Sequence, residues 1–271
     1  MGTGFEITFL GTSGSCTYSA GNRNKYGVNT PCVAVNAGSE TIIFDAGSGI
    51  VGFGDLHDYH RDHIRLFFTH YHIDHINGLL FCSQLFNRER SFDLYGHSYN
   101  GKDIYGILGD YLSEPLQPGG IGAFTAKLGF HTVETGDVIQ LSEGVTVRAH
   151  DLSHPGGSTG YRVEYGGKSL CYCTDIELNK HKNDSALLDF IRDVDLLIID
   201  SGFDDGKVIE GWGHSSWREC AEWSKEADVK QMALFHYGYK QSDDEIADIE
   251  RRAKAVFPGA FASADRMRVV L

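Results

Sequence analysis

Short apolar runs separated by glycine-rich turns recur along this chain and predict a protein rich in β-strands. Two of these runs, Cys32 to Asn36 and Thr41 to Phe44, flank the turn Ala37-Gly38-Ser39-Glu40 and predict a hairpin. The strands are expected at residues 6–10, 32–36, 41–44, 64–68, 145–149, 161–165, 170–173, 196–199 and 232–235.

Other segments space their apolar residues as helices do. Residues 98–112, 185–192, 215–227 and 243–256 are predicted to be helical, and the last two carry charged faces. Residues 113–125 contain two prolines and three glycines, which predict a loop. Two runs of strands, each followed by helices, indicate an α/β protein. Because no linker or internal repeat interrupts the pattern, we expect one domain over residues 1–271.

The composition narrows the choice of partner. The chain has 271 residues, of which 41% are hydrophobic, and its formal net charge is −13 at pH 7. A surface that binds tRNA or DNA is normally basic, because phosphate contacts dominate its affinity. The sequence contains no cluster of lysine and arginine. We therefore expect a small-molecule substrate, with nucleic acid a less suitable partner.

The cysteine pattern and the absence of long apolar segments point to the cytoplasm. No stretch is long and apolar enough to span a membrane, and the first residues do not form a secretory signal. Most of the six cysteines lie in apolar contexts, as buried reduced thiols do. Cys171 and Cys173 lie two residues apart and could alternatively share a metal, but no second pair with zinc-site spacing accompanies them.

Residues 70–75, His-Tyr-His-Ile-Asp-His, are the most informative stretch of the chain. An apolar run from Ile64 to Phe68 precedes them and would deliver them from a buried strand into a loop. A run with helical spacing follows, at Ile76, Leu79, Leu80 and Leu85. Neither a core nor a solvated face requires three histidines and an aspartate within six positions. The potential metal ligands are His70, His72, Asp74 and His75.

The types of these residues already limit the metal. Imidazole and carboxylate ligands suit zinc, manganese or iron, and the lack of a thiolate argues against a purely structural zinc site. Two divalent ions roughly 3.5–4 Å apart could share a hydroxide and lower its pKa toward neutrality. A site with one ion is the alternative.

The pattern His-x-His-x-Asp-His resembles the signature of the metallo-β-lactamase superfamily. The resemblance implies a four-layer αββα sandwich, in which two mixed sheets lie face to face with helices outside. It also supplies later ligands in chain order, each at the end of a strand-like run or in the loop that follows it. By resemblance, His70, His72 and His154 hold one metal ion, Asp74, His75 and His236 hold the second, and Asp175 bridges them.

A second motif, Gly211-Trp212-Gly213-His214-Ser215-Ser216-Trp217, resembles one found in the ribonuclease Z-like phosphodiesterases of that superfamily. In that branch the histidine lies near the metals and assists the leaving oxygen, and His214 is our candidate for this role. The simpler alternative is that His214 or Ser215 only caps the next helix. Asp200, at the end of a strand-like run, is expected to hydrogen-bond His214, or else to open a turn.

Two departures from ribonuclease Z favour a smaller substrate. We find no Gly-Pro-rich insertion of the kind that forms its tRNA-binding arm, and residues 45–49 differ from its acidic glycine-rich loop. Cyclic nucleotides and related cyclic phosphates are the expected substrates. In the loop at 22–27, Arg23 or Lys25 could contact phosphate and Tyr26 could stack on a base, although a solvated loop without contacts is an equal alternative.

The leading hypothesis is therefore a two-metal phosphodiesterase. A metal-bridging hydroxide would attack phosphorus, Asp74 would orient or deprotonate the water, and His214 would assist the leaving alkoxide. The alternatives are a thioester, lactone or β-lactam hydrolase, a tRNA 3′-processing ribonuclease, and a metal-dependent sensor without activity. Relatives of this branch are often dimers, so the resemblance also implies a possible homodimer.

Overall fold

The computed structural model describes residues 4–19, 21–56, 59, 61–141, 144–181 and 184–271. Within them, two seven-stranded sheets have the orders β14-β1-β2-β3-β4-β5-β6 and β13-β12-β11-β10-β9-β8-β7. The first sheet comprises β1 (Phe5–Gly11), β2 (Cys32–Ala37), β3 (Glu40–Phe44), β4 (His63–Phe67), β5 (Ser91–Gly96), β6 (Lys127–Thr132) and β14 (Arg268–Val270). The second comprises β7 (Val138–Gln140), β8 (Thr146–Leu152), β9 (Ser158–Tyr165), β10 (Lys168–Cys173), β11 (Leu196–Asp200), β12 (Met232–Phe235) and β13 (Ala260–Ala262).

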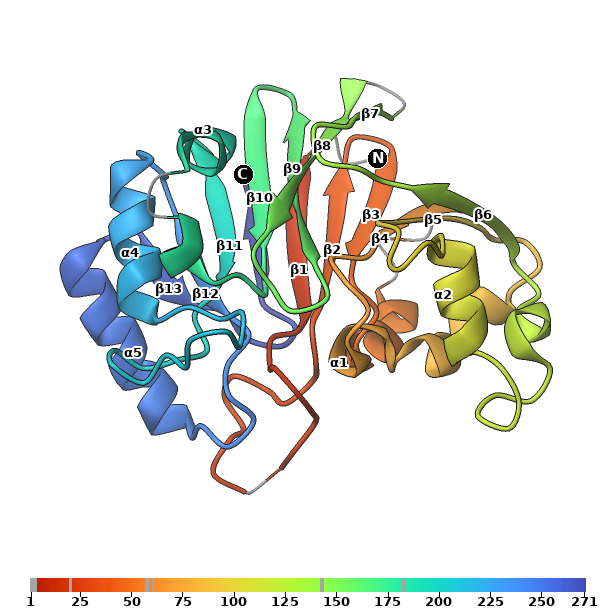
Figure 1. Cartoon of the computed structure of the whole chain (residues 1–271), viewed down its shortest axis with the longest axis horizontal. Helices are drawn as coiled ribbons and strands as arrows, with labels where there is room; N and C mark the ends of the chain where they lie inside the picture. Colours follow the sequence, from red (N-terminus) through yellow and green to blue (C-terminus); the bar gives the residue numbers. More distant parts are fainter. Residues whose placement is uncertain (1–3, 20, 57–58, 60, 142–143, 182–183) are drawn as a thin grey trace.

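Both sheets are mixed, as expected. The strands β3 to β6 run parallel, and so do β10 to β13, whereas the strands at the other end of each sheet pair antiparallel. Parallel strands have their carboxyl ends at a common edge, which is where ligands bind in sheets of this kind. In Figure 1 the helix that follows β4, at residues Ile73–Ile76, lies just below the strands of the first sheet.

Helices cover the outer face of each sheet (Figure 1). The helices α3 (Ser185–Ile191), α4 (Trp217–Glu226) and α5 (Asp243–Val256) pack on the second sheet, and α1 (Ile73–Ile76) and α2 (Ile104–Tyr111) lie on the side of the first. Short 3₁₀ turns complete these layers at Ser48–Asp55, Leu79–Phe81, Ser83–Phe86, Gly120–Ala123 and Leu178–His181. No helix of the described residues is long and apolar enough to cross a membrane.

Three apolar cores correspond to the three contacts between layers. The central core joins the sheets through side chains such as Phe44 and Phe67 from the first and Tyr161 and Tyr172 from the second. Phe44 stacks on Tyr172 with their ring centroids 5.1 Å apart. The other two cores lie beneath the outer helices. The predicted αββα sandwich is confirmed, with one apolar layer for each pair of faces.

Two predicted helices are shorter than expected. The helix predicted at 98–112 begins only at Ile104, because Asp103 caps it by accepting a hydrogen bond from the Gly106 amide. The apolar run after the histidine cluster forms α1 and two 3₁₀ turns in place of one continuous helix. A Cβ at Gly78 would lie 2.0 Å from the carbonyl oxygen of Gly47, so this turn packs against the backbone of another loop.

Candidate metal centre

The loop that leaves β4 places the histidine cluster at the edge of the first sheet. β4 lies between β3 and β5 and ends at the buried residue Phe67. His70 follows and is 2% exposed, while His72 is the exposed member of the cluster. Asp74 and His75 lie in the first turn of α1 and are buried. A short stretch of chain thus presents all four side chains at one point.

The second sheet brings three more side chains to the same point. His154 follows β8, Asp175 follows β10, and His236 is the residue directly after β12. The His154 Nε2 lies 3.1 Å from the Nδ1 of His72. Residues far apart in the sequence therefore meet where the two sheets face each other.

The donor atoms fall into two groups. The first ligand group is His70, His72 and His154, and the second ligand group is Asp74, His75 and His236. Within each group, one donor atom from every residue lies within 4.8 Å of the others. These are the two sets that the sequence resemblance implied.

Asp175 lies between the two ligand groups. Its Oδ1 is 3.9 Å from the His70 Nε2 and 3.8 Å from the His154 Nε2. Its Oδ2 is 3.2 Å from the His75 Nε2 and 3.4 Å from the His236 Nε2. One oxygen therefore faces each group, which is the arrangement that a bridging carboxylate requires.

Three buried imidazole nitrogens indicate that a ligand belongs here. The Nε2 atoms of His70, His75 and His236 are buried and make no hydrogen bond with the described residues. Buried polar atoms in proteins almost always have a partner, so such atoms call for an explanation such as an ion. A divalent metal ion is the partner that imidazole and carboxylate donors in this arrangement fit.

Hydrogen bonds to the other ring nitrogen fix the orientation of the histidines. The His75 Nδ1 lies 2.9 Å from the Asp45 Oδ2, and the His154 Nδ1 donates to the carbonyl oxygen of Gly213 at 2.8 Å. Such contacts select the nitrogen that faces a metal and hold the ring in place. A Cβ at Gly213 would lie 2.1 Å from the His154 Nδ1, so only glycine fits there.

Asp45 is the supporting residue that the sequence did not identify. It is fully buried and accepts hydrogen bonds from the amide and hydroxyl of Thr69 and from the hydroxyl of Tyr172. Its backbone has φ +57°, and Asp175 and His236 share this left-handed conformation with φ +56° and +62°. Such strain in residues other than glycine concentrates at functional sites. The position of Asp45 directly after a predicted strand was the available signal.

In the metal-free centre, protonated histidines offset the negative charge of the carboxylates. Burial raises the pKa of Asp175, but the neighbouring His236, His75 and His70 outweigh it and hold that pKa well below its usual range. Burial lowers the pKa of His75, but Asp175 and Asp45 outweigh it and raise that pKa well above its usual range. Imidazolium charge thus neutralises the carboxylates, and a divalent ion would supply the same positive charge in place of the protons.

His214 lies beside the two ligand groups, as predicted, and is partly exposed. Its Nδ1 is 2.6 Å from the Asp200 Oδ2 and 3.7 Å from the Asp175 Oδ1, and its ring stacks on that of His236. Burial lowers the pKa of His214, but the charge and the hydrogen bond of Asp200 outweigh it and raise the pKa to about 9. The predicted contact between Asp200 and His214 is therefore present.

Helix capping, the alternative role considered for His214 or Ser215, is performed by Ser216. Ser216 caps α4 in a reciprocal arrangement with Glu219. The Ser215 hydroxyl donates to the Ile176 carbonyl and accepts from the Leu178 amide, so Ser215 anchors the loop. Glu177 was also missed by the sequence: it is buried and accepts from the amides of Gly211 and Gly213.

The structure corrects two of the three substrate contacts predicted for the 22–27 loop. Tyr26 is 2% exposed and packs on Tyr237, so it cannot stack on a base. The Arg23 guanidinium is buried and donates to the Ser13 hydroxyl and the Gly238 carbonyl. Lys25 is exposed and its amine donates to the Tyr26 hydroxyl, so its contact with phosphate stays a prediction. The loop therefore supports residues 13–15, where the Ser15 amide donates to the Asp74 Oδ2.

Comparisons with known proteins agree with this geometry. The model of the β-lactamase superfamily domain matches residues 40–237. The chain is 26% identical to a ribonuclease Z of Methanosarcina acetivorans, over 97% of each protein. It is also 26% identical to a ribonuclease Z of a Bradyrhizobium species, over 98% of this chain and 100% of the relative.

Solved structures share the fold across nearly the whole chain. The metallo-β-lactamase fold protein YhfI of Bacillus subtilis superposes with a TM-score of 0.75 at 19% identity, covering 100% of both chains. The short form of human tRNase Z gives 0.69 at 18% identity, covering 97% of this chain and 98% of the other. At such identities the likeness establishes the fold alone. Together with the family match and the curated relatives, it shows that this chain belongs to the metallo-β-lactamase superfamily of hydrolases, in the ribonuclease Z-like branch.

Proposed function

We propose that this protein is a two-metal phosphodiesterase that hydrolyses a small phosphodiester, most simply a cyclic nucleotide or a related cyclic phosphate. The observation that carries the proposal is the His214–Asp200 pair, which lies beside Asp175 and the second ligand group. A phosphodiester releases an alkoxide, which is a poor leaving group unless it receives a proton. The His214–Asp200 pair is suited to supply that proton.

The residues that would hold the ions are those of the two ligand groups, with Asp175 between them. Zinc is the metal we favour, and manganese or iron accept the same donors. When bound, two such ions lower the pKa of a shared water and offset negative charge on the phosphate. Asp74 is fixed by the Ser15 amide and is placed to orient the attacking water.

The contacts of His214 indicate which of its ring nitrogens would donate the proton. Because Asp200 holds the Nδ1, the Nε2 is the atom left to face the substrate. The raised pKa keeps the ring protonated at neutral pH in the metal-free protein. Two nearby dications would lower that pKa toward the range in which an imidazolium releases its proton readily. Asp200 would also stabilise the ring in the orientation needed for transfer.

Two other functions remain candidates of this fold. Ribonuclease Z-type tRNA 3′ processing is favoured by the names of the curated relatives, at 26% identity over nearly their full length. The net charge of −13 argues against a polyanionic partner. A thioester hydrolase would have less need of His214, because a thiolate is a much better leaving group than an alkoxide. A lactone hydrolase also releases an alkoxide and is distinguished by its products. We also propose a homodimer, on the resemblance alone.

Product analysis on protein loaded with zinc or manganese tests the proposal. We expect turnover of at least one 2′,3′- or 3′,5′-cyclic nucleotide or cyclic dinucleotide, and a loss of roughly 10²–10⁴-fold in His214→Ala. His131→Ala, which removes a half-exposed histidine on β6, is the matched control. With metal confirmed as bound, cleavage of thioesters or lactones alone would overturn the proposal, and cleavage of precursor tRNA alone would establish the ribonuclease function.

A further inference from the structure

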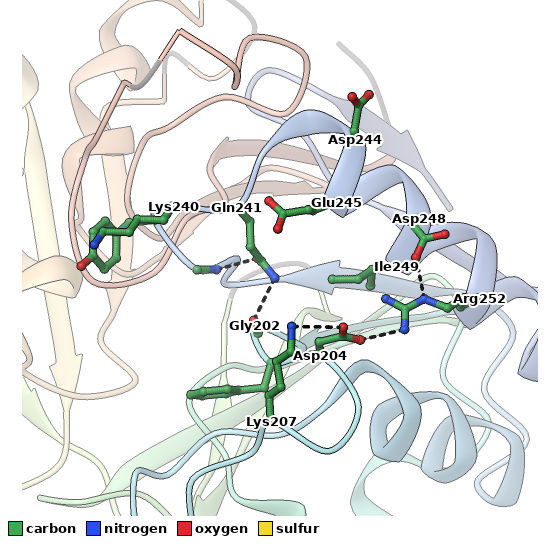
Figure 2. Close-up of a pocket in the computed structure, with 13 residues that line it drawn as sticks. Gly202, Asp204, Lys207, Lys240, Gln241, Asp244, Glu245, Asp248, Ile249 and Arg252 are labelled. Carbon is green, nitrogen blue, oxygen red and sulfur yellow. Dashed lines mark hydrogen bonds and ion pairs between the residues drawn. The ribbon is translucent and has the colours of Figure 1, made fainter.

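A pocket of about 550 Å³ adjoins the metal centre and contains none of its predicted ligands. It lies between the segment after β11 and the beginning of α5 (Figure 2). Its volume is within the range of roughly 300–1,000 Å³ that small-molecule ligands occupy. Phe203, in its wall, has its ring 5.7 Å from that of His214. Phe203 therefore lies between the pocket and His214.

The backbone ties this wall to the centre. Gly202 lies so close to the His236 carbonyl that a Cβ there would be 2.4 Å from its oxygen. Gln241 donates to the Gly202 carbonyl and accepts from the Gly238 amide, which joins the two sides of the pocket near His236 (Figure 2). The end of the pocket nearest the centre is thus fixed in position.

Most acidic groups of the pocket are already engaged. Asp204 accepts from the Trp217 indole and pairs with Arg252, which also pairs with Asp248. Glu245 caps the beginning of α5. In Figure 2 the carboxylate of Asp244 points away from the other labelled groups. Arg252 therefore offsets part of the negative charge of Asp204 and Asp248, and the Asp244 carboxylate lies away from the space where a ligand would bind.

Two lysines of the pocket keep their charge available. Lys240 makes no ion pair within the described part of the chain, and its amine lies 5.4 Å from the centre of the Tyr239 ring. Lys207 is 73% exposed and lies 3.6 Å from Asp204, a loose contact. Figure 2 shows the two amines apart, with that of Lys207 beside Asp204, so a ligand must extend across the pocket, past the rings of Phe203 and Tyr239, to contact both.

We propose that this pocket binds the leaving half of the substrate, and that Lys240, assisted by Lys207, binds a second phosphate on that half. The inference rests on the proposed function: if His214 protonates the leaving oxygen, the group released lies on the His214 side. In the hydrolysis, water forms the new bond to phosphorus and gives a proton to Asp74 or to solvent, the bond to the leaving oxygen breaks, and His214 supplies the proton to that oxygen. The substrate class is then a dinucleotide, linear or cyclic, in preference to a cyclic mononucleotide with its single phosphate.

Calorimetric binding tests the pocket without relying on turnover. The ligands are adenosine 3′,5′-bisphosphate, adenosine 5′-monophosphate and adenosine 3′-monophosphate, each titrated into zinc-loaded protein. We expect the bisphosphate to bind about tenfold more tightly than either monophosphate, since a charged hydrogen bond to phosphate adds to its affinity. In Lys240→Ala the preference should fall to about threefold or less, and the additional Lys207→Ala change should remove it.

The control and the contrary outcomes separate this inference from the proposed function. Lys127→Ala, which removes an exposed lysine on β6, should keep the wild-type preference and so account for the general attraction of a more highly charged ligand. Equal binding of the three nucleotides, or an unchanged preference in the double variant, would overturn the pocket assignment even if the protein cleaves phosphodiesters. A preference that depends on Lys240 in a protein without phosphodiesterase activity would sustain the pocket and reject the function.

Discussion

The two ligand groups of the metal centre differ in how firmly the fold holds them. In the second ligand group all three side chains are buried, and His75 is fixed by Asp45, which is itself bound to Thr69 and Tyr172 inside the central core. In the first ligand group His70 is buried and its Nδ1 contacts the Thr69 hydroxyl, but His72 is exposed and His154 depends on one carbonyl of the 211–214 loop. The second group is therefore organised before metal binds, and the first is completed by surface loops.

This difference explains how one centre can combine high affinity for metal ions with access for a substrate. A preorganised, buried donor set loses little conformational entropy when it binds an ion. An exposed group leaves room for substrate but holds its ion less firmly. We therefore expect the second ligand group to fill first and to retain its ion longest when a chelator is added.

Substitution of Asp175, which lies between the two ligand groups, should have the largest effect. Asp175→Asn keeps the shape of the side chain and removes the charge that faces both groups. We expect the metal content to fall below two ions per chain and activity to drop by about 10⁴-fold or more, as when a constellation loses a member on which it depends. Metal analysis and kinetics on the same sample would check this. Full occupancy with full activity would show that the groups act independently.

Substitution within each group should then separate them. His72→Ala should leave about one ion per chain, held by the second ligand group, whereas His75→Ala should disturb both ions because its Nε2 also lies beside Asp175. Each variant should lose activity by roughly 10²–10³-fold. Chelator titration followed by mass spectrometry of the intact protein distinguishes them. An identical metal loss in both variants would contradict the proposed difference between the groups.

The support of the second ligand group can be weakened without touching a ligand. Asp45→Asn keeps a similar shape but removes the carboxylate that orients His75, and we expect metal affinity to fall by about 10–100-fold. The first group is linked to Asp45 only indirectly, through the Thr69 hydroxyl that contacts the His70 Nδ1, so its ion should be affected less. Competition with a zinc chelator measures both steps. Asp93→Asn, a change in a carboxylate on the outer part of β5, should leave both affinities unchanged.

The sequence revealed the parts of the centre that are contiguous or that follow an apolar run. The 70–75 cluster needed no fold to be noticed, and α5 occupies the residues that its apolar spacing predicted. His154, Asp175 and His236 could be selected because each follows a strand-like run, with the resemblance fixing their order. Short strands such as β7, β13 and β14 were missed, because three residues carry too little pattern to distinguish them from loops.

The missing parts depend on tertiary contacts. Asp45 and His75 lie 30 residues apart, and nothing in either local sequence shows that they meet. Arg23 and Tyr26 carry side chains suited to a nucleotide, but the fold turns them inward, toward Gly238 and Tyr237. Residue type suggested a binding role there, whereas burial shows that the 22–27 loop supports the residues that contact Asp74.

The smallest predicted effect concerns the titration of Asp265, which helps to hold the loop at residues 13–15. Asp265 accepts hydrogen bonds from the amides of Val28 and Asn29 and from the Thr12 hydroxyl, and so anchors the chain on both sides of the Ser13–Ser15 loop. Burial raises its pKa to about 6, from an ordinary value of 3.8. A raised carboxyl pKa means that the folded state binds the proton more tightly than the unfolded state. Its contribution to stability is thus complete below about pH 4 and is lost as the pH rises through about 6.

Asp265→Asn removes this pH dependence while its amide oxygen can still accept from the two backbone amides. As the pH rises from 4.5 to 7.5, the free energy of unfolding of the variant should increase by roughly 1–3 kcal/mol relative to that of wild type. Urea unfolding of metal-free protein at both pH values measures the difference, and the exposed Asp228→Asn is the matched control. If wild type and variant respond to pH in parallel, Asp265 is ionised without penalty. The loop at residues 13–15 would then be held equally firmly at both pH values. The support of the second ligand group would, in that case, be as independent of pH as the contact between Asp45 and His75 requires.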